Sequence, residues 1–185
     1  MSGVGGEMAT RQTHKRPEKI RLGVSACLLG ERVRYDGGHR HNRYLTGTLG
    51  RRVEWVPVCP EVECGLPVPR EAMHLEGDPT SPRLVTETGG IDHTAQMSRW
   101  IRRRLRELAS ENLRGFVLKS KSPSCALRGI PVCDAPARPG RCGMGLFARA
   151  LVERWPTMPV EEAERLSDPE RRKKFLERVF GQSGT

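Results

Sequence analysis

The chain has 185 residues, enough for one domain with a substantial hydrophobic core and too few for two comfortable ones. Charged residues make up 29% and hydrophobic residues 36%, a balance that argues against a membrane protein and against a wholly disordered chain. The 32 Lys and Arg against 22 Asp and Glu give a formal net charge of +10, which makes a nucleic acid or another phosphate-bearing molecule a candidate partner. The sequence has neither a long apolar run nor a signal-peptide core, so we expect a cytoplasmic protein.

The first 18 residues are polar and offer nothing to a core, so we expect a disordered tail at 1–18, one domain over 19–181 and a short tail at 182–185. Hydrophobic patterning in the first half of the domain predicts a strand at 20–26, a loop at 34–42, a short helix at 44–52 and a strand at 53–58. Pro57 lies inside the second strand, and because proline lacks an amide donor it belongs at the edge or end of a strand. Residues 60–82 contain five prolines and no regular period, which predicts a long ordered loop.

The second half of the domain is predicted to alternate strand and helix. We expect an extended piece at 83–86, a helix at 92–112, a strand at 115–119, an irregular stretch at 120–140, and helices at 143–154 and 168–180. Asp168 is the expected N-cap of the last helix, with Pro169 at its first position. The long helix has an apolar face and a face rich in arginine, which is either solvated or a surface that binds nucleic acid. Strand, helix and strand in succession predict a parallel sheet covered by helices.

Three of the six cysteines fall at or beyond the ends of the predicted strands. Cys27 and Cys59 follow the first and second strands directly, and Cys125 lies in the loop after the third. Because the loops after parallel strands meet at one edge of the sheet, we expect these three thiols to converge on one site. The other three, Cys64, Cys133 and Cys142, have no metal-binding spacing and are interpreted as ordinary thiols, with Cys64 close enough to Cys59 to act as a spare ligand or redox partner.

Three convergent thiolates allow more than one chemistry. A structural zinc ion needs four protein ligands, and only His39 or His41 could supply the fourth. A cubane iron–sulfur cluster bound by three thiolates keeps one open iron, a Lewis acid that binds soft sulfur. Nucleophilic catalysis by a cysteine is a third possibility, although no Cys/His pairing is evident in the sequence.

Four motifs in series make the chain resemble a known family. They are V-S-A-C-L-L-G-x-x-V-R-Y-D-G at 24–37, C-P-E-x-x-x-G-L-x-x-P-R at 59–70, L-K-S-K-S-P-S-C at 118–125 and R-L-S-D-P-x-x-R-x-x-F at 165–175. Over about residues 21–180 the chain resembles the family long catalogued as domain of unknown function 523 (DUF523), which includes the thiouracil desulfidases. The resemblance implies a single three-layer, Rossmann-like α/β domain with a parallel sheet at its core.

The resemblance also implies an activity: iron–sulfur-dependent, non-redox desulfuration of a thiolated uracil base or nucleotide. Its [4Fe-4S] cluster would be held by Cys27, Cys59 and Cys125, with the substrate sulfur binding the open iron. The family's acid/base carboxylate falls on Glu61, which would activate water. Its catalytic serine falls on Ser122, with Ser124 as the second choice.

Further residues are candidate substrate contacts. Asp36 is a turn residue beside the Cys27 loop that could also contact substrate, and Ser124 could donate a hydrogen bond to it. Lys121, together with Lys119, could bind the phosphate of a thiolated nucleotide, free or derived from tRNA, or could simply be solvated. We expect neither a membrane nor an obligate protein partner. Two rival functions remain: a nucleic-acid-binding module that carries a metal or cluster, and a sulfur or redox carrier whose loop cysteine cycles.

Overall fold

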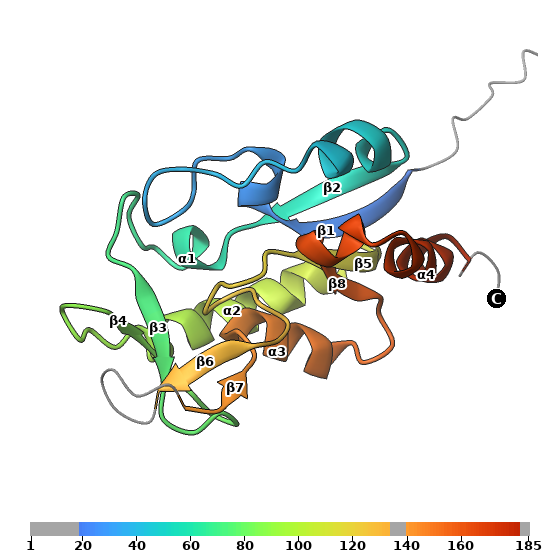
Figure 1. Ribbon diagram of the computed structural model, residues 1–185. Coiled ribbons are helices and arrows are strands. Elements are labelled where there is room, and N and C mark those ends of the chain that lie inside the picture. The colour runs from blue at the N-terminus through green and yellow to red at the C-terminus, as the bar shows by residue number, and fades with distance from the viewer. Residues whose placement is uncertain (1–18, 134–139, 182–185) are drawn as a thin grey trace, which may run out of the picture.

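The computed structural model describes residues 19–133 and 140–181, so the tails expected at 1–18 and 182–185 lie outside the described residues. The centre of the fold is a parallel sheet of four strands in the order β2-β1-β5-β8 (Figure 1). The strands are β1 (Ile20–Ser25), β2 (Val53–Val58), β5 (Leu113–Leu118) and β8 (Val160–Glu162). Pro57 lies in β2, and β2 is an edge strand, a position at which a residue without an amide donor is tolerated.

Helices cover both faces of this sheet, which confirms the three-layer α/β fold (Figure 1). On one face α2 (Thr94–Ala109) and α3 (Leu146–Arg154) pack in a hydrophobic cluster that includes Trp100, Phe116 and Phe147. On the other face α4 (Pro169–Phe180) and the short turns Tyr44–Thr48 and Leu49–Arg51 pack around Leu22 and Val24 of β1. Both faces of the central strands are therefore buried, as their continuous apolar sequences require.

The helix signals in the sequence correspond to observed helix geometry. The buried residues of α2 include Met97, Ile101 and Leu108, whereas its arginines at 99, 102, 103 and 106 are exposed. The helix α4 begins after Asp168, whose carboxylate accepts hydrogen bonds from the amides of Glu170 and Arg171 at 2.9 and 3.1 Å. The expected N-cap is therefore confirmed.

A second, smaller sheet corrects the prediction of long loops at 60–82 and 120–140. Its order is β4-β3-β6-β7, with strands β3 (Met73–Glu76), β4 (Arg83–Thr86), β6 (Ile130–Cys133) and β7 (Cys142–Gly143). A short helix, α1 (Pro60–Glu63), also lies within the first of these segments. These elements contain at most four residues each, too few to show a periodic pattern, and β3 pairs with the distant β6.

Other departures are smaller. The expected helix at 44–52 is a π turn followed by a 3-10 turn, and Gly47 and Gly50 lie in this segment. The helix expected from residue 143 begins at Leu146, because Gly143 belongs to β7 and Gly145 is the N-cap. The strand β8 was not predicted; it has only three residues.

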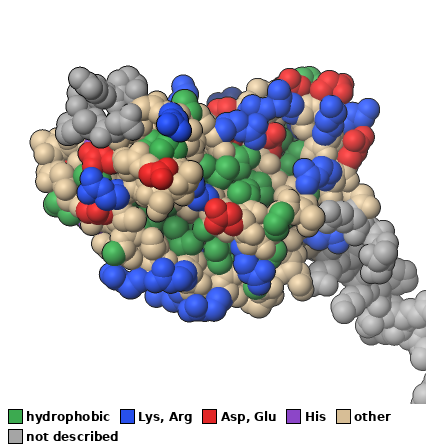
Figure 2. All heavy atoms as spheres, turned by 90° about the horizontal axis from the view of Figure 1, so that it is seen from below, with side chains coloured by type: hydrophobic (Ala, Val, Ile, Leu, Met, Phe, Trp, Pro, Cys, Tyr) green, Lys and Arg blue, Asp and Glu red, His purple; other side chains and the backbone are tan. Residues whose placement is uncertain are grey.

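The surface seen from below carries Lys and Arg side chains mainly toward its margins and hydrophobic side chains nearer its centre (Figure 2). Acidic side chains lie among the basic ones, so on this face the positive charge does not form one continuous patch. No helix in the described ranges is long and apolar enough to cross a membrane.

Candidate active site

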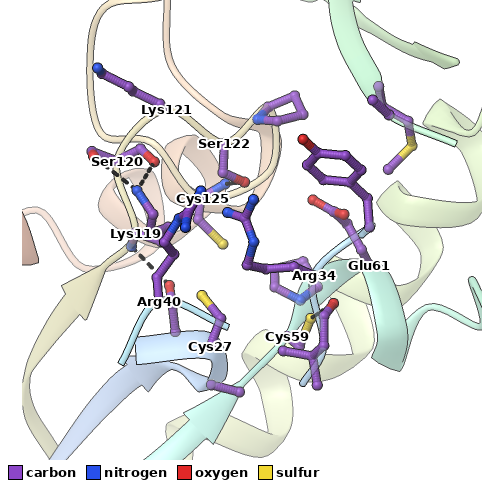
Figure 3. A pocket seen from close by; sticks show the side chains of 18 of the residues that line it. Cys27, Arg34, Arg40, Cys59, Glu61, Lys119, Ser120, Lys121, Ser122 and Cys125 are labelled. Carbon is purple, nitrogen blue, oxygen red and sulfur yellow. Dashed lines mark hydrogen bonds between the residues drawn. The ribbon is translucent and has the colours of Figure 1, made fainter. Parts of the chain in front are cut away.

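A cavity of about 610 Å³ lies beyond the carboxyl ends of β1, β2 and β5. Cys27, Cys59 and Cys125 all line it, one from the segment after each strand (Figure 3). Glu61, Ser122 and Lys121 line the same cavity. The loops that follow parallel strands thus bring residues from three distant parts of the chain to one place.

Local backbone hydrogen bonds fix the position of each cysteine. The carbonyl of Cys27 accepts from the amide of Arg40 at 2.8 Å. The amide of Cys59 donates to Glu63 Oε1 at 2.8 Å, and the amide of Cys125 donates to Ser122 Oγ at 3.1 Å. The backbone of each cysteine is therefore held by a hydrogen bond to another residue of the segment around it.

The three thiols are largely removed from water. Burial raises the pKa of Cys27 and of Cys59 to about 11. Burial also raises the pKa of Cys125 well above its ordinary value. At neutral pH these groups are therefore neutral thiols in the metal-free chain, and metal ions bind them by displacing their protons.

The three thiols are donors of the type that an iron–sulfur cluster takes. Within the described ranges, no group of three or more His, Cys, Asp and Glu side chains is placed to hold one metal ion. A cubane cluster binds each thiolate at a different iron, so its ligands need not crowd around one point. His39 and His41 do not line the cavity, and His41 Nε2 instead lies 2.9 Å from Thr46 Oγ1. Three soft, desolvated thiols facing one cavity fit an iron–sulfur cluster with three protein ligands.

The carboxylate of Glu61 is held on both oxygens. Oε2 accepts hydrogen bonds from Nε and Nη2 of Arg70 at 2.9 and 2.5 Å, and Oε1 accepts from Ser124 Oγ at 2.9 Å. The side chain of Arg70 is only 6% exposed, and its Nη2 also donates to the carbonyl of Val33 at 2.9 Å. Such a charge-assisted contact through two guanidinium nitrogens fixes a carboxylate in one orientation.

The two serines of the Cys125 loop have different surroundings. Ser122 lines the cavity, and its Oγ accepts from the amides of Ser124 and Cys125 at 3.3 and 3.1 Å. Ser124 is completely buried, is not among the residues that line the cavity, and donates to Glu61. Among the described residues the Ser122 hydroxyl proton has no acceptor, so it is available to a molecule in the cavity, whereas that of Ser124 is donated to Glu61.

The predicted substrate contacts are separated by the fold. Asp36 does not line the cavity; its carboxylate accepts from Arg34 Nε and Nη2 at 3.1 and 2.9 Å, and these hydrogen bonds lower its pKa to about 2. Arg34 does line the cavity, so Asp36 positions a residue of the wall. Lys119 Nζ is bound by Glu164 at 2.7 Å, whereas Lys121 is exposed at the rim and has a positive φ of 54°.

Sequence reasoning did not assign Arg70 or Tyr35 to the site, although both line the cavity, as does Arg40. The signal for Arg70 was its place at the end of the 59–70 motif. Cys64 lies outside the cavity lining; its sulfur donates to the backbone carbonyl of Glu61 at 3.2 Å. Its side chain packs against the hydrophobic cluster of α2 and α3, so it is not placed as a fourth ligand.

Comparison with known proteins agrees with this arrangement. Residues 22–163 match the family model for 2-thiouracil desulfurase. The solved structure of the [4Fe-4S]-dependent thiouracil desulfidase TudS superposes with a TM-score of 0.63 at 33% sequence identity, covering 86% of this chain and 98% of that one. No curated protein matches the sequence. The fold, the cavity at the carboxyl edge of its sheet and these matches together show that the chain belongs to the 2-thiouracil desulfurase family.

Proposed function

We propose that this protein is a [4Fe-4S]-dependent desulfidase that hydrolyses the carbon–sulfur double bond of a thiolated uracil base or nucleotide. The observation that carries the proposal is the meeting of three buried thiols and an oriented carboxylate in one cavity. In the overall reaction, water supplies the oxygen of the new carbonyl and the sulfur leaves as hydrogen sulfide. Nothing is oxidised or reduced, so no electron donor is required.

The residues that would hold the cluster are Cys27, Cys59 and Cys125. When bound by three thiolates, a [4Fe-4S] cluster supplies an open iron that acts as a Lewis acid toward sulfur. Near the cluster the chain would contribute a buried wall that includes Ser25, Ala26 and Val58. A site shielded from water in this way protects labile iron–sulfur bonds and strengthens electrostatic contacts to the substrate.

Glu61 is the proposed general base. Its carboxylate lines the cavity and would take a proton from the water that attacks the thiolated carbon. Arg70 and Ser124 fix the orientation of the carboxylate, because each of its two oxygens accepts a hydrogen bond from one of these side chains. Ser122 lines the cavity, and its hydroxyl proton, which has no acceptor among the described residues, would be donated to the thiolated uracil.

The rim of the cavity suits a negatively charged substituent on the substrate. Arg40 and Lys121 line the cavity, and the structure gives neither side chain an acidic partner in the described residues. Lys119, by contrast, is neutralised by Glu164. A phosphate carried by a thiolated nucleotide would therefore meet Arg40 and Lys121 rather than Lys119.

The test is iron and acid-labile sulfide content after anaerobic purification or reconstitution, together with sulfide release from 2-thiouracil and from 4-thiouridine monophosphate. We expect about four irons per chain, as for one cubane cluster, and sulfide release from at least one of the two substrates. Alanine at Cys27, Cys59 or Cys125 should abolish both, whereas Cys142→Ala, at an exposed site on β7, should change neither. Stoichiometric zinc without iron would contradict the proposal.

A further inference from the structure

A second cavity, of about 290 Å³, lies at the opposite edge of the parallel sheet. It is formed by the end of α2, the start of β5 and the connection from α3 to β8, which lies at the far end of β5 from the active-site loops (Figure 1). Its lining residues are Leu108, Ala109, Asn112, Leu113, Arg114, Trp155, Thr157, Met158 and Pro159. None of them lines the active-site cavity, so the two cavities are separate.

Arg114 is anomalous in this cavity. It is half-buried and lies near the start of β5, between Leu113 and Phe116, where the register between β1 and β5 shifts. Its Nε and one Nη atom are buried and have no hydrogen-bond partner, and no ion pair to it is formed within the described residues. Guanidinium nitrogens that are shielded from water and have no acceptor are disfavoured, so a molecule that accepts hydrogen bonds from them would be bound favourably at this position.

Other arginines with a buried nitrogen differ from Arg114 in this respect. Arg21, Arg104 and Arg165 each form an ion pair with a glutamate. Arg149 donates to the carbonyls of Pro79 and Thr80. Within the part of the chain that the structure describes, Arg114 alone combines buried nitrogens with no partner of any kind.

The surroundings of Arg114 favour an anion with an apolar body. Leu108, Leu113, Trp155, Met158 and Pro159 give the cavity apolar walls, and no carboxylate lines it. Two more cations lie nearby, because the Arg154 guanidinium is 5.3 Å from the centre of the Trp155 ring and Arg178 donates to the Thr157 carbonyl. The closest acids in sequence, Glu107 and Glu111, are paired with arginines 103, 104 and 21.

We propose that this second cavity binds a small organic anion, whose carboxylate or phosphate pairs with Arg114 and whose apolar body packs against Trp155. A volume of about 290 Å³ is near the lower end for ligand pockets and suits a single-ring molecule. The site does not depend on the proposed desulfidase activity. Its chemistry comes from the unpaired guanidinium and the apolar walls alone.

The test uses the full chain with its cluster assembled and records the tryptophan indole signals by ¹H–¹⁵N NMR. Of the three tryptophans, only Trp155 lines this cavity, and Trp155→Phe assigns its signal. Benzoate, phenyl phosphate and inorganic phosphate serve as probes. We expect benzoate or phenyl phosphate to shift the Trp155 signal saturably, the stronger of the two identifying the preferred anion.

Two variants separate this site from the active site. Arg114→Met should weaken binding about tenfold or more, the loss expected for a charge-assisted hydrogen bond. Lys121→Met, at the rim of the other cavity, should leave the Trp155 titration unchanged. The proposal is overturned if no probe shifts Trp155, if inorganic phosphate alone does so, or if Arg114→Met binds as well as the wild type.

Stability without ligand provides an independent check. Because Met replaces a half-buried guanidinium that has no ion pair in the described residues with an apolar chain, Arg114→Met should have a thermal midpoint no lower than that of the wild type. Arg104→Met is the matched control, since its guanidinium pairs with Glu63 and Glu107 and its loss should lower the midpoint. A drop in Arg114→Met as large as in the control would mean that Arg114 is structural and would refute the ligand site.

Discussion

At the scale of single residues, the site depends on a carboxylate with a fixed orientation. Glu61 is 14% exposed, and its Arg70 partner is more deeply buried at 6%. Arg70 is nine residues away in the chain and Ser124 is 63 residues away, yet both meet the same carboxylate. Because the guanidinium also bonds to the carbonyl of Val33, it connects the Glu61 helix to the Cys27 loop. One side chain thus orients the base and joins two of the cysteine loops.

Glu61→Gln should retain the cluster and lose sulfide release by at least about a hundredfold, because an amide cannot accept a proton from water. Iron content and sulfide production are the measurements. Glu31→Gln is the control: this glutamate is exposed on the loop after Cys27, outside the cavity lining, and should behave as wild type. Unchanged turnover in Glu61→Gln would remove Glu61 from the mechanism.

Arg70→Lys should lower kcat by about tenfold while KM changes little. The single nitrogen of an ammonium cannot replace the two guanidinium nitrogens that bond Glu61 Oε2 and also bond the Val33 carbonyl. The expected split between kcat and KM distinguishes a positioning residue from a substrate contact. Arg40→Lys changes a proposed substrate contact that lines the cavity, so it should raise KM rather than lower kcat. Equal effects of the two substitutions on KM would refute the positioning role of Arg70.

At the scale of elements, the Cys125 loop is hydrogen-bonded to the start of α3. The amides of Gly145, Leu146 and Phe147 donate to the carbonyls of Ala126, Pro123 and Ser124, so the free N–H groups of the helix start are satisfied by the active-site loop. Gly145 makes this close approach possible. A Cβ there would lie 2.6 Å from the carbonyl carbon and oxygen of Ser124 and 2.8 Å from the Cys125 amide.

Gly145→Ala should therefore destabilise the fold by about 1–3 kcal/mol, the usual cost of an overpacked backbone contact, and reduce iron content by displacing Cys125. Urea unfolding and iron analysis measure the two effects. Gly47→Ala is the control, because a Cβ at Gly47 would have no atom within 4 Å. Its free energy of unfolding should change by less than about 0.5 kcal/mol. Full iron occupancy in Gly145→Ala would show that the loop tolerates the shift.

At the scale of the whole molecule, the three cysteines connect distant parts of the fold. Cys27 and Cys59 follow neighbouring strands, and Cys125 follows β5 on the other side of β1. A cluster bound to all three would cross-link the segments that follow β1, β2 and β5 at the carboxyl edge of the sheet. Metal binding that occurs only in the folded state adds directly to the stability of that state.

Removing the cluster with a chelator under anaerobic conditions should lower the thermal midpoint by at least about 5 °C, a shift that corresponds to a few kcal/mol for a chain of this size. Circular dichroism before and after chelation measures it. The cluster-free chain should keep its helices, because two hydrophobic clusters hold them without any metal. Identical midpoints in the two forms would contradict a cross-linking role for the three thiols.

The elements with long patterns were predictable. Strand β2 has the predicted bounds, and the helices α2 and α4 begin within two residues of where the sequence placed them. Their apolar periods and the Asp168 cap are local signals that tertiary contacts reinforce. The second sheet was not predictable, because its strands pair residues far apart in sequence and each is too short to alternate clearly.

The sequence by itself determined which cysteines could meet, since Cys27, Cys59 and Cys125 follow strands whose ends share one edge of a parallel sheet. Its motifs also indicated the family that the comparisons show. Only the tertiary structure decided what surrounds those thiols. The pairing of Arg70 with Glu61, the burial of Ser124 and the unpaired guanidinium of Arg114 depend on side chains from separate elements, and no local pattern in a chain records which of its distant side chains will touch.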